Sequence, residues 1–171
     1  MSEPAPDLTL LVPCFNEAAR VGHLLEAVRD FVKAHPELRC ELLLVDDGSD
    51  DETAALLGDA SVPGIPVRML SLPENRGKGA ALRVGMEASR GESVLFLDAD
   101  LAVDLSHVDP ALALLADGAD VVVGCRNVAG AQVRRPQGFL RRSLGRGYRR
   151  LSSWWLGLEV SDVTCGFKAF R

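Results

Sequence analysis

The chain has 171 residues, of which 47% are apolar and 25% charged. These values predict one globular domain with a buried core and exclude a disordered chain. The net charge of −5 hides a split, since residues 1–125 carry 9 basic and 22 acidic side chains (−13) and residues 126–171 carry 10 basic and 2 acidic ones (+8). The acidic part argues against nucleic-acid binding, and the basic end favours an anionic partner such as a phosphate group or a membrane surface.

Three further classes are disfavoured by the sequence. No apolar run approaches the ~20 residues of a membrane-spanning helix. The first residues lack the basic start and the apolar core of a secretory peptide. The cysteines form no C-x-x-C pair, which disfavours a zinc site and a thioredoxin-like motif. We therefore expect a reduced chain in the cytoplasm.

Short apolar runs alternate with segments of helical spacing along the first 125 residues. The predicted strands are 8–12, 41–45, 67–72, 93–97 and 120–124, and the predicted helices are 17–33, 51–57, 79–89 and 105–115. This order implies an α/β fold with an open, mostly parallel sheet covered by helices on both faces. Ligands of such sheets bind beyond the carboxyl ends of the strands, so the residues after each strand are the candidates for a site.

Polar residues follow all five predicted strands. In chain order they are Pro13, Asn16 and Glu17; Asp46 and Asp47; the turn Asn75-Arg76-Gly77-Lys78-Gly79; Asp98 and Asp100; and Arg126. Each group alone is also typical of a turn or a helix cap, and we expect Asp50 and Asp51 only to begin a helix. Five such groups at one edge of a sheet indicate a ligand site.

The turn at 75–79 is basic and rich in glycine, and it leads into a helix. It lacks the spacing and the Ser/Thr of a Walker loop, and no G-x-G-x-x-G follows the first strand, which disfavours a dinucleotide oxidoreductase. Backbone amides at a helix start, together with Arg76 and Lys78, suit a diphosphate.

Asp98 and Asp100 directly follow an apolar strand. Two carboxylates at this spacing can project the same way and suit a hard divalent cation, Mg²⁺ or Mn²⁺, whose other ligands are water and a diphosphate. An acidic turn without a metal is the alternative, and the place after a buried strand favours the metal.

Four segments together resemble the inverting GT-A glycosyltransferases of the family-two type: Val12-Pro13-Cys14-Phe15-Asn16-Glu17, Val45-Asp46-Asp47-Gly48-Ser49, Asn75-Arg76-Gly77-Lys78-Gly79-Ala80-Ala81 and Asp98-Ala99-Asp100. The resemblance extends from about Leu8 to Arg171. Paired arginines at 141–142 and 149–150, followed by Asp162-Val163-Thr164-Cys165-Gly166-Phe167-Lys168, look like the dolichyl-phosphate (polyprenyl-phosphate) glucosyl- and mannosyltransferases. The run at 164–168 is closest to the glucosyl branch.

The resemblance implies a role for each matching residue. Those implied to bind the nucleotide are Pro13, Asn16 and Glu17, with Asp46 against the base and Asp47 and Lys78 nearby. Asp98 would hold the ribose side and, with Asp100, the metal. A catalytic set is implied by Asp100 at the metal and diphosphate, Arg126 at the phosphates and Asp162 in an acceptor-side loop that also contains Lys168.

The implied fold is a Rossmann-like GT-A domain, and the implied reaction moves a hexose, with glucose favoured, from a nucleotide-diphosphate sugar to a polyprenyl or dolichyl phosphate with inversion. A phosphate monoester has its second pKa near ~6, so it is already a nucleophile at neutral pH and needs positioning more than a strong base. A metal would stabilise the departing diphosphate. The sequence leaves open UDP-glucose or GDP-mannose as donor, the lipid length and the oligomeric state.

The basic end has a distinct pattern at 139–158. Apolar residues recur at helical spacing, and several arginines lie off that stripe. Such a helix suits the surface of an anionic leaflet, and an ordinary helix packed on the sheet is the alternative. The resemblance favours membrane contact, with the protein peripheral on the inner face of the membrane. Arg134 and Arg135 suit the phosphate of the acceptor.

We thus expect residues 1–125 to form a nucleotide-sugar-binding core and residues 126–171 to form an acceptor- and membrane-facing segment of the same domain. Chains that resemble this family usually continue past the Gly-Phe-Lys motif, so a shortened C-terminus is expected. Two alternatives stay open: a GT-A transferase with a soluble saccharide or another lipid as acceptor, and a non-catalytic module that binds a nucleotide or a membrane.

Overall fold

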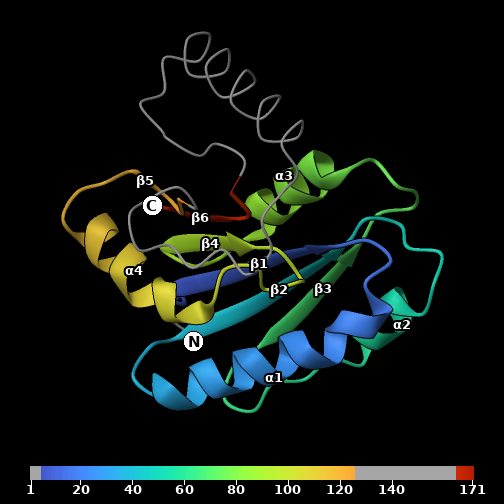
Figure 1. Ribbon diagram of the computed structural model, residues 1–171, viewed down its shortest axis with the longest axis horizontal. Coiled ribbons are helices and arrows are strands. Elements are labelled where there is room, and N and C mark those ends of the chain that lie inside the picture. The colour runs from blue at the N-terminus through green and yellow to red at the C-terminus, as the bar shows by residue number, and fades with distance from the viewer. Residues whose placement is uncertain (1–4, 126–164) are drawn as a thin grey trace, which may run out of the picture. The chain divides into compact units, whose positions relative to one another are not determined.

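The computed structural model describes residues 5–125 and 165–171 (Figure 1). The strands are β1 (Leu8–Cys14), β2 (Cys40–Asp46), β3 (Val67–Ser71), β4 (Ser93–Leu97), β5 (Val121–Val123) and β6 (Phe167–Phe170). The helices are α1 (Ala18–Ala34), α2 (Thr53–Gly58), α3 (Lys78–Ala88) and α4 (Val108–Ala116), with a short 3₁₀ turn at Leu105–His107 before α4. Every predicted strand and helix lies within two residues of an observed one, and β6 was not predicted.

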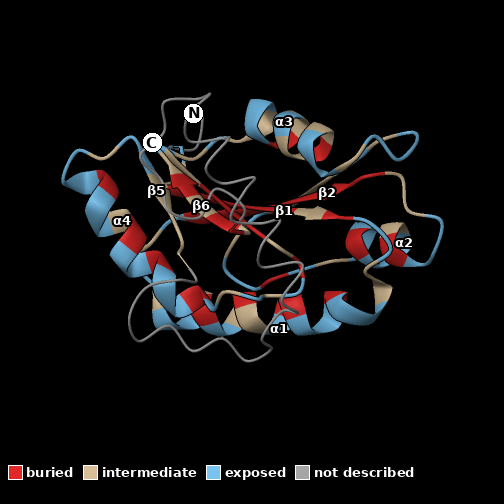
Figure 2. Ribbon diagram, turned by 45° about the horizontal axis from the view of Figure 1, so that its top comes forward, coloured by how far each residue is buried: buried red, intermediate tan, exposed pale blue. Residues whose placement is uncertain are grey.

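These strands form one six-stranded sheet in the order β3-β2-β1-β4-β6-β5. β1 pairs in parallel with β2 and β4, β2 pairs in parallel with β3, and β4 pairs antiparallel with β6. α3 covers one face and α1 the other, with α2 beside α1 (Figure 2). All seven residues of β2 are buried, as continuous apolar strands covered on both faces require. The predicted α/β fold with a mostly parallel sheet is confirmed.

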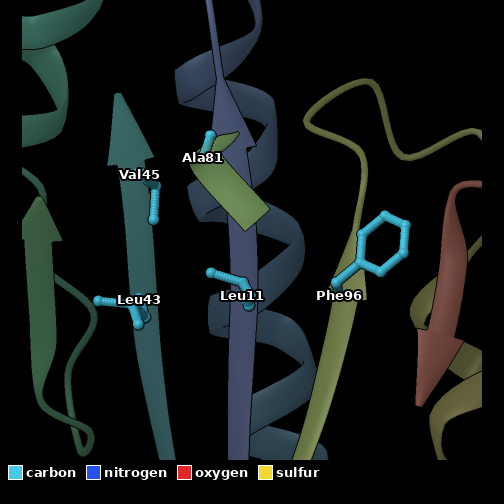
Figure 3. Packing of buried hydrophobic residues seen from close by; sticks show 5 residues of the cluster. All are labelled: Leu11, Leu43, Val45, Ala81 and Phe96. Atoms are coloured by element: carbon cyan, nitrogen blue, oxygen red, sulfur yellow. The ribbon is translucent and has the colours of Figure 1, made fainter. Parts of the chain in front are cut away.

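A cluster of apolar side chains joins α3 to the sheet. It consists of Leu11, Leu43, Val45, Ala81 and Phe96 (Figure 3). Gly85 of α3 makes the close approach feasible, because a Cβ there would lie 2.3 Å from Cδ1 of Leu11. The first turn of α3 is thereby held at the carboxyl edge of the sheet.

A buried carboxylate ties the other edge of the sheet together. Glu41, with 1% of its surface exposed, accepts hydrogen bonds from Thr9 Oγ1 (2.7 Å), Arg68 Nη1 (3.0 Å) and the amide of Arg90 (2.8 Å). Burial alone would raise the pKa of Glu41, but these bonds and the charge of Arg68 outweigh it and lower that pKa. The strands are therefore fixed at the edge opposite to the polar loops.

The chain divides into two compact units, Met1–Val122 with Phe167–Arg171, and Val123–Gly166. The predicted division at residue 125 stays a prediction, although the last strand belongs to the sheet of the first unit. Within the described residues, no helix has the length and apolar character that a bilayer crossing requires.

Candidate functional site

The first unit has a pocket of about 280 Å³ beyond the carboxyl ends of its strands. Four of the five predicted groups contribute to its walls, which are formed by Pro13, Cys14, Phe15, Glu17, Asp47, Asn75, Gly77, Lys78, Asp98, Ala99 and Asp100. The prediction that the residues after separate strands meet at one edge is confirmed for these groups. Arg126, the fifth, lies outside the described residues.

The loop after β1 supplies both polar and apolar walls. Phe15, which the sequence analysis did not single out, lines the pocket with 41% of its surface exposed. An exposed ring offers a flat apolar face on which a nucleotide base can stack. The signal in the sequence was an aromatic residue in a loop that directly follows a buried strand. Burial raises the pKa of the neighbouring Cys14 thiol to about 12, so it stays protonated at neutral pH.

Asn16 has a different place from the one predicted. It is not among the residues that line the pocket, and its φ of 54° is in the left-handed region, which asparagine tolerates. Its amide donates to Ser49 Oγ (3.0 Å), and its side-chain oxygen accepts from the amide of Asp50 (3.1 Å). Asn16 thus ties the loop after β1 to the loop after β2. The expected role of Asp51 at a helix start is confirmed, since its carboxylate accepts from the amide of Thr53 (2.9 Å).

The two aspartates after β2 have separate functions in the turn. Asp46 is buried and accepts from Ser49 Oγ (2.5 Å) and Ser71 Oγ (3.1 Å), so it holds the turn together. Asp47 lines the pocket, and its carboxylate accepts from the amide of Arg76 (3.0 Å). Of the two residues predicted at the nucleotide, Asp47 is therefore the one that reaches the pocket.

Gly48 brings the loops after β2 and β3 together. Its φ is +69°, and a Cβ there would lie 2.4 Å from the carbonyl carbon of Glu74. Only glycine combines this conformation with so close a backbone approach. The contact places Asp47 and Asn75 in the walls of the same pocket.

Asp98 and Asp100 line the same pocket, as their spacing predicts. Asp98 forms an ion pair with Lys78, which begins α3. Asp100 accepts a hydrogen bond from the amide of Ala102 (3.0 Å). Leu101 between them and the next helix has a φ of 49°, a strained conformation for leucine that fixes a tight turn directly after the two carboxylates.

The chemistry of this donor set fits a divalent cation. Carboxylate oxygens are the ligands that Mg²⁺ and Mn²⁺ prefer. Among residues 5–125 and 165–171, no group of three His, Cys, Asp or Glu side chains is placed to hold a metal. Asp98 and Asp100 alone suit a cation that takes its remaining ligands from water and a bound phosphate group, as Mg²⁺ commonly does.

The charge of the pocket supports the same conclusion. Four carboxylates and one ammonium group line it: Glu17, Asp47, Asp98, Asp100 and Lys78. Arg20, another residue that the sequence analysis missed, pairs with Glu17 from the first turn of α1. The hydrogen bond and charge of Glu17, with a smaller contribution from Asp100, raise the pKa of Arg20. An excess of acids would repel a diphosphate unless a cation lay between them.

The remaining predicted residues fall in two groups. Arg126, Arg134, Arg135, Asp162 and the segment 139–158 lie outside the described residues, so their roles stay predictions. Lys168 is in strand β6, where the sequence analysis expected a loop. Its partner in the register of the antiparallel pair is Phe96.

The sequence matches the family described as "Glycosyl transferase family 2" over residues 9–171. A dolichyl-phosphate beta-glucosyltransferase of Drosophila melanogaster is 34% identical over 181 residues, which cover 98% of this chain and 55% of the relative. A dodecaprenyl-phosphate galacturonate synthase of Rhizobium johnstonii is 32% identical over 175 residues, covering 96% of this chain and 48% of the relative. The chain thus spans about half the length of the curated relatives it matches.

A solved structure, mannosyltransferase PcManGT from Pyrobaculum calidifontis in complex with GDP-Man and Mn²⁺, resembles this fold with a TM-score of 0.64. The identity is 24%, and the match covers 98% of this chain and 45% of the other. At this identity the likeness shows the fold alone, and it confirms the predicted GT-A architecture.

Proposed function

Because this chain belongs to glycosyl transferase family 2, we propose that it transfers a hexose, with glucose favoured, from a nucleotide-diphosphate sugar to a polyprenyl or dolichyl phosphate. The observation that carries the proposal is the pocket in which Asp98 and Asp100 lie beside Lys78 and an exposed aromatic ring. The printed names of the relatives, which act on dolichyl and dodecaprenyl phosphates, support this acceptor class.

The pocket has suitable groups for each part of such a donor. The exposed ring of Phe15 suits the base, and Asp47 lies beside it in the pocket wall, where its carboxylate can accept hydrogen bonds from base or ribose. Lys78 suits a phosphate oxygen, because its ammonium group lines the pocket at the first turn of a helix. Glu17 and Asp98 complete the polar wall.

A divalent cation held by Asp98 and Asp100 would neutralise the charge that develops on the departing diphosphate. The chain's own part is to keep both carboxylates at one pocket, which the tight turn at Leu101 achieves. Since the acceptor phosphate is largely dianionic at neutral pH, the pocket needs no carboxylate that acts as a base. A single displacement by that phosphate gives inversion at the anomeric carbon.

The residues outside the described range complete the proposal. We assign Arg126 to the donor phosphates, Arg134 and Arg135 to the acceptor phosphate, and Asp162 to the acceptor side. We assign the segment 139–158 to peripheral contact with the inner face of the membrane. The sequence supports these assignments through its net charge of +8 over residues 126–171 and the resemblance of the motifs there.

The test is a donor screen with the 171-residue chain. Radiolabelled UDP-glucose, GDP-mannose and UDP-galacturonate are each supplied with Mg²⁺ or Mn²⁺ and a polyprenyl phosphate, and label is counted in the organic phase. We expect transfer from UDP-glucose above the other donors. The relative that acts on galacturonate makes the uronate donor the second candidate.

The same screen separates the alternatives. Label that appears only on an added soluble saccharide would replace the lipid phosphate as acceptor. Binding of UDP or GDP, measured by calorimetry, with no transfer to any acceptor would indicate a nucleotide-binding module and would contradict the proposed reaction.

A further inference from the structure

Two lysines from distant parts of the chain lie over one phenylalanine ring. The Nζ atom of Lys78 is 5.1 Å from the centroid of Phe96, and the Nζ atom of Lys168 is 4.8 Å from the same centroid. Lys78 begins α3, Lys168 is in β6, and Phe96 is in β4 next to β6. The ring itself is almost completely buried, with 5% of its surface exposed, and belongs to the cluster beneath α3 (Figure 3).

The register of the sheet explains this convergence. Phe96 and Lys168 are direct partners in the antiparallel pair of β4 and β6, so their side chains leave the sheet on the same face. Ala81, one turn after Lys78, packs in the cluster that contains Phe96. Both ammonium groups are therefore brought to the ring by elements of the core, and not by exposed loops.

A ring face holds an ammonium group in a particular way. It attracts the positive charge without accepting its hydrogen bonds and without cancelling it, as a carboxylate would. Since each nitrogen lies about 5 Å from one centroid, the two charges are at most two such distances apart. Like charges this close repel each other, and an anion placed between them removes the repulsion.

The place of the two charges relates them to the pocket. Lys78 lines the pocket and pairs with Asp98, which lies two residues after Phe96. We infer that Phe96 positions Lys78 and Lys168 as a two-ammonium clamp for a phosphate group at the Asp98 side of the pocket. This inference rests on the proposed function and deepens it: Lys168 binds phosphate oxygens together with Lys78, and Phe96 is a positioning residue that does not touch the substrate.

Four variants test the clamp. Lys168→Met removes one charge, Lys168→Arg keeps it, and Phe96→Leu keeps the apolar volume but removes the ring face. Lys33→Met is the matched control, because Lys33 is an exposed lysine that pairs with Asp30 on α1. The measurements are calorimetric affinities for UDP and GDP with Mg²⁺ and the KM values for donor and polyprenyl phosphate, with thermal unfolding midpoints for every variant.

We expect Lys168→Met to weaken at least one phosphate ligand by about tenfold or more, and Phe96→Leu by about threefold to tenfold. Lys168→Arg should stay close to the wild type, and Lys33→Met should not differ from it. A role that is only structural would lower the unfolding midpoint and would not be rescued by arginine in the ligand affinities. Unchanged affinities and KM values in both Lys168→Met and Phe96→Leu would overturn the inference; if Phe96→Leu fails to fold, the two Lys168 variants decide.

The two sources of a phosphate group are distinguished by the same data. A loss confined to UDP or GDP affinity and donor KM identifies the donor diphosphate, and a loss confined to the acceptor KM identifies the lipid phosphate. If the wild type transfers no sugar but Lys168→Met still weakens UDP or GDP binding, the proposed function fails and the clamp stands. If the wild type transfers sugar and Lys168→Met matches it throughout, the clamp fails and the function stands.

Discussion

Asp98 and Asp100 touch different partners, and this difference predicts different effects of neutralising them. Asp100→Asn leaves the Lys78 ion pair intact, so we expect a lower transfer rate, by about a hundredfold or more, together with a higher Mn²⁺ requirement. Asp98→Asn also releases Lys78 and should weaken donor binding as well. The measurement is the initial rate against Mn²⁺ concentration, with Asp59→Asn, an exposed aspartate after α2, as control. An unchanged metal requirement in Asp100→Asn would contradict the metal site.

Glu41 predicts how stability depends on pH. Its pKa in the folded chain is below the ordinary value of 4.5, so its contribution is present above that pH and is lost as pH falls through the lower folded value. Glu41→Gln should lower the free energy of unfolding at pH 7 by about 2 kcal/mol, because a charged acceptor of buried hydrogen bonds is removed. Urea unfolding from pH 7 to pH 3 should show the difference between the two chains shrinking. A difference that stays constant would count against this role.

The sequence identified most pocket residues, but it could not assign neighbouring ones. Adjacent side chains at a strand end project to opposite faces, so the choice between Asp46 and Asp47 depends on which face the site occupies. That face is set by long-range packing, which a local pattern does not contain. The exposure of Phe15 likewise follows from the loops around it, and its residue type alone is equally typical of a core.

At the scale of elements, strength of pattern decided what could be predicted. β2 and β4 are uninterrupted apolar runs, and their positions follow from burial between two layers of helices. β6 has only four residues, of which alternate ones are buried, and its stability comes from pairing with β4 about 70 residues earlier. A pairing so distant in sequence leaves no local signal, which explains why Lys168 was expected in a loop.

Gly48 carries a prediction about two loops. Gly48→Ala places a Cβ against the backbone of Glu74 at a positive φ, so we expect a loss of about 1–3 kcal/mol in unfolding free energy and weaker donor binding through the displaced Asp47. Gly22→Ala is the matched control in α1, where nothing lies within 4 Å, and it should stabilise the chain by up to about 1 kcal/mol. Chemical denaturation and UDP calorimetry measure both effects. Equal behaviour of the two variants would contradict the tight contact.

At the scale of the whole molecule, the charge split predicts association with anionic bilayers. Residues 126–171 carry a net charge of +8, and each arginine near such a surface contributes about 1 kcal/mol. We expect co-sedimentation with anionic vesicles that weakens as salt is added, and little with neutral vesicles. Trp154→Ser/Trp155→Ser should reduce the apolar part of binding. Equal, negligible sedimentation of wild type and variant would remove the membrane assignment.

The return of the chain to the sheet at β6 has a consequence for how such proteins can diversify. β5 ends at Val123 and β6 begins at Phe167, and these two strands are neighbours in the sheet. Everything between them is an insertion whose two ends are anchored side by side, so its length and composition can change at a small cost in loop-closure entropy. Grafting residues 124–166 from a relative with another acceptor should therefore exchange acceptor preference while the donor preference of the parent is inherited unchanged.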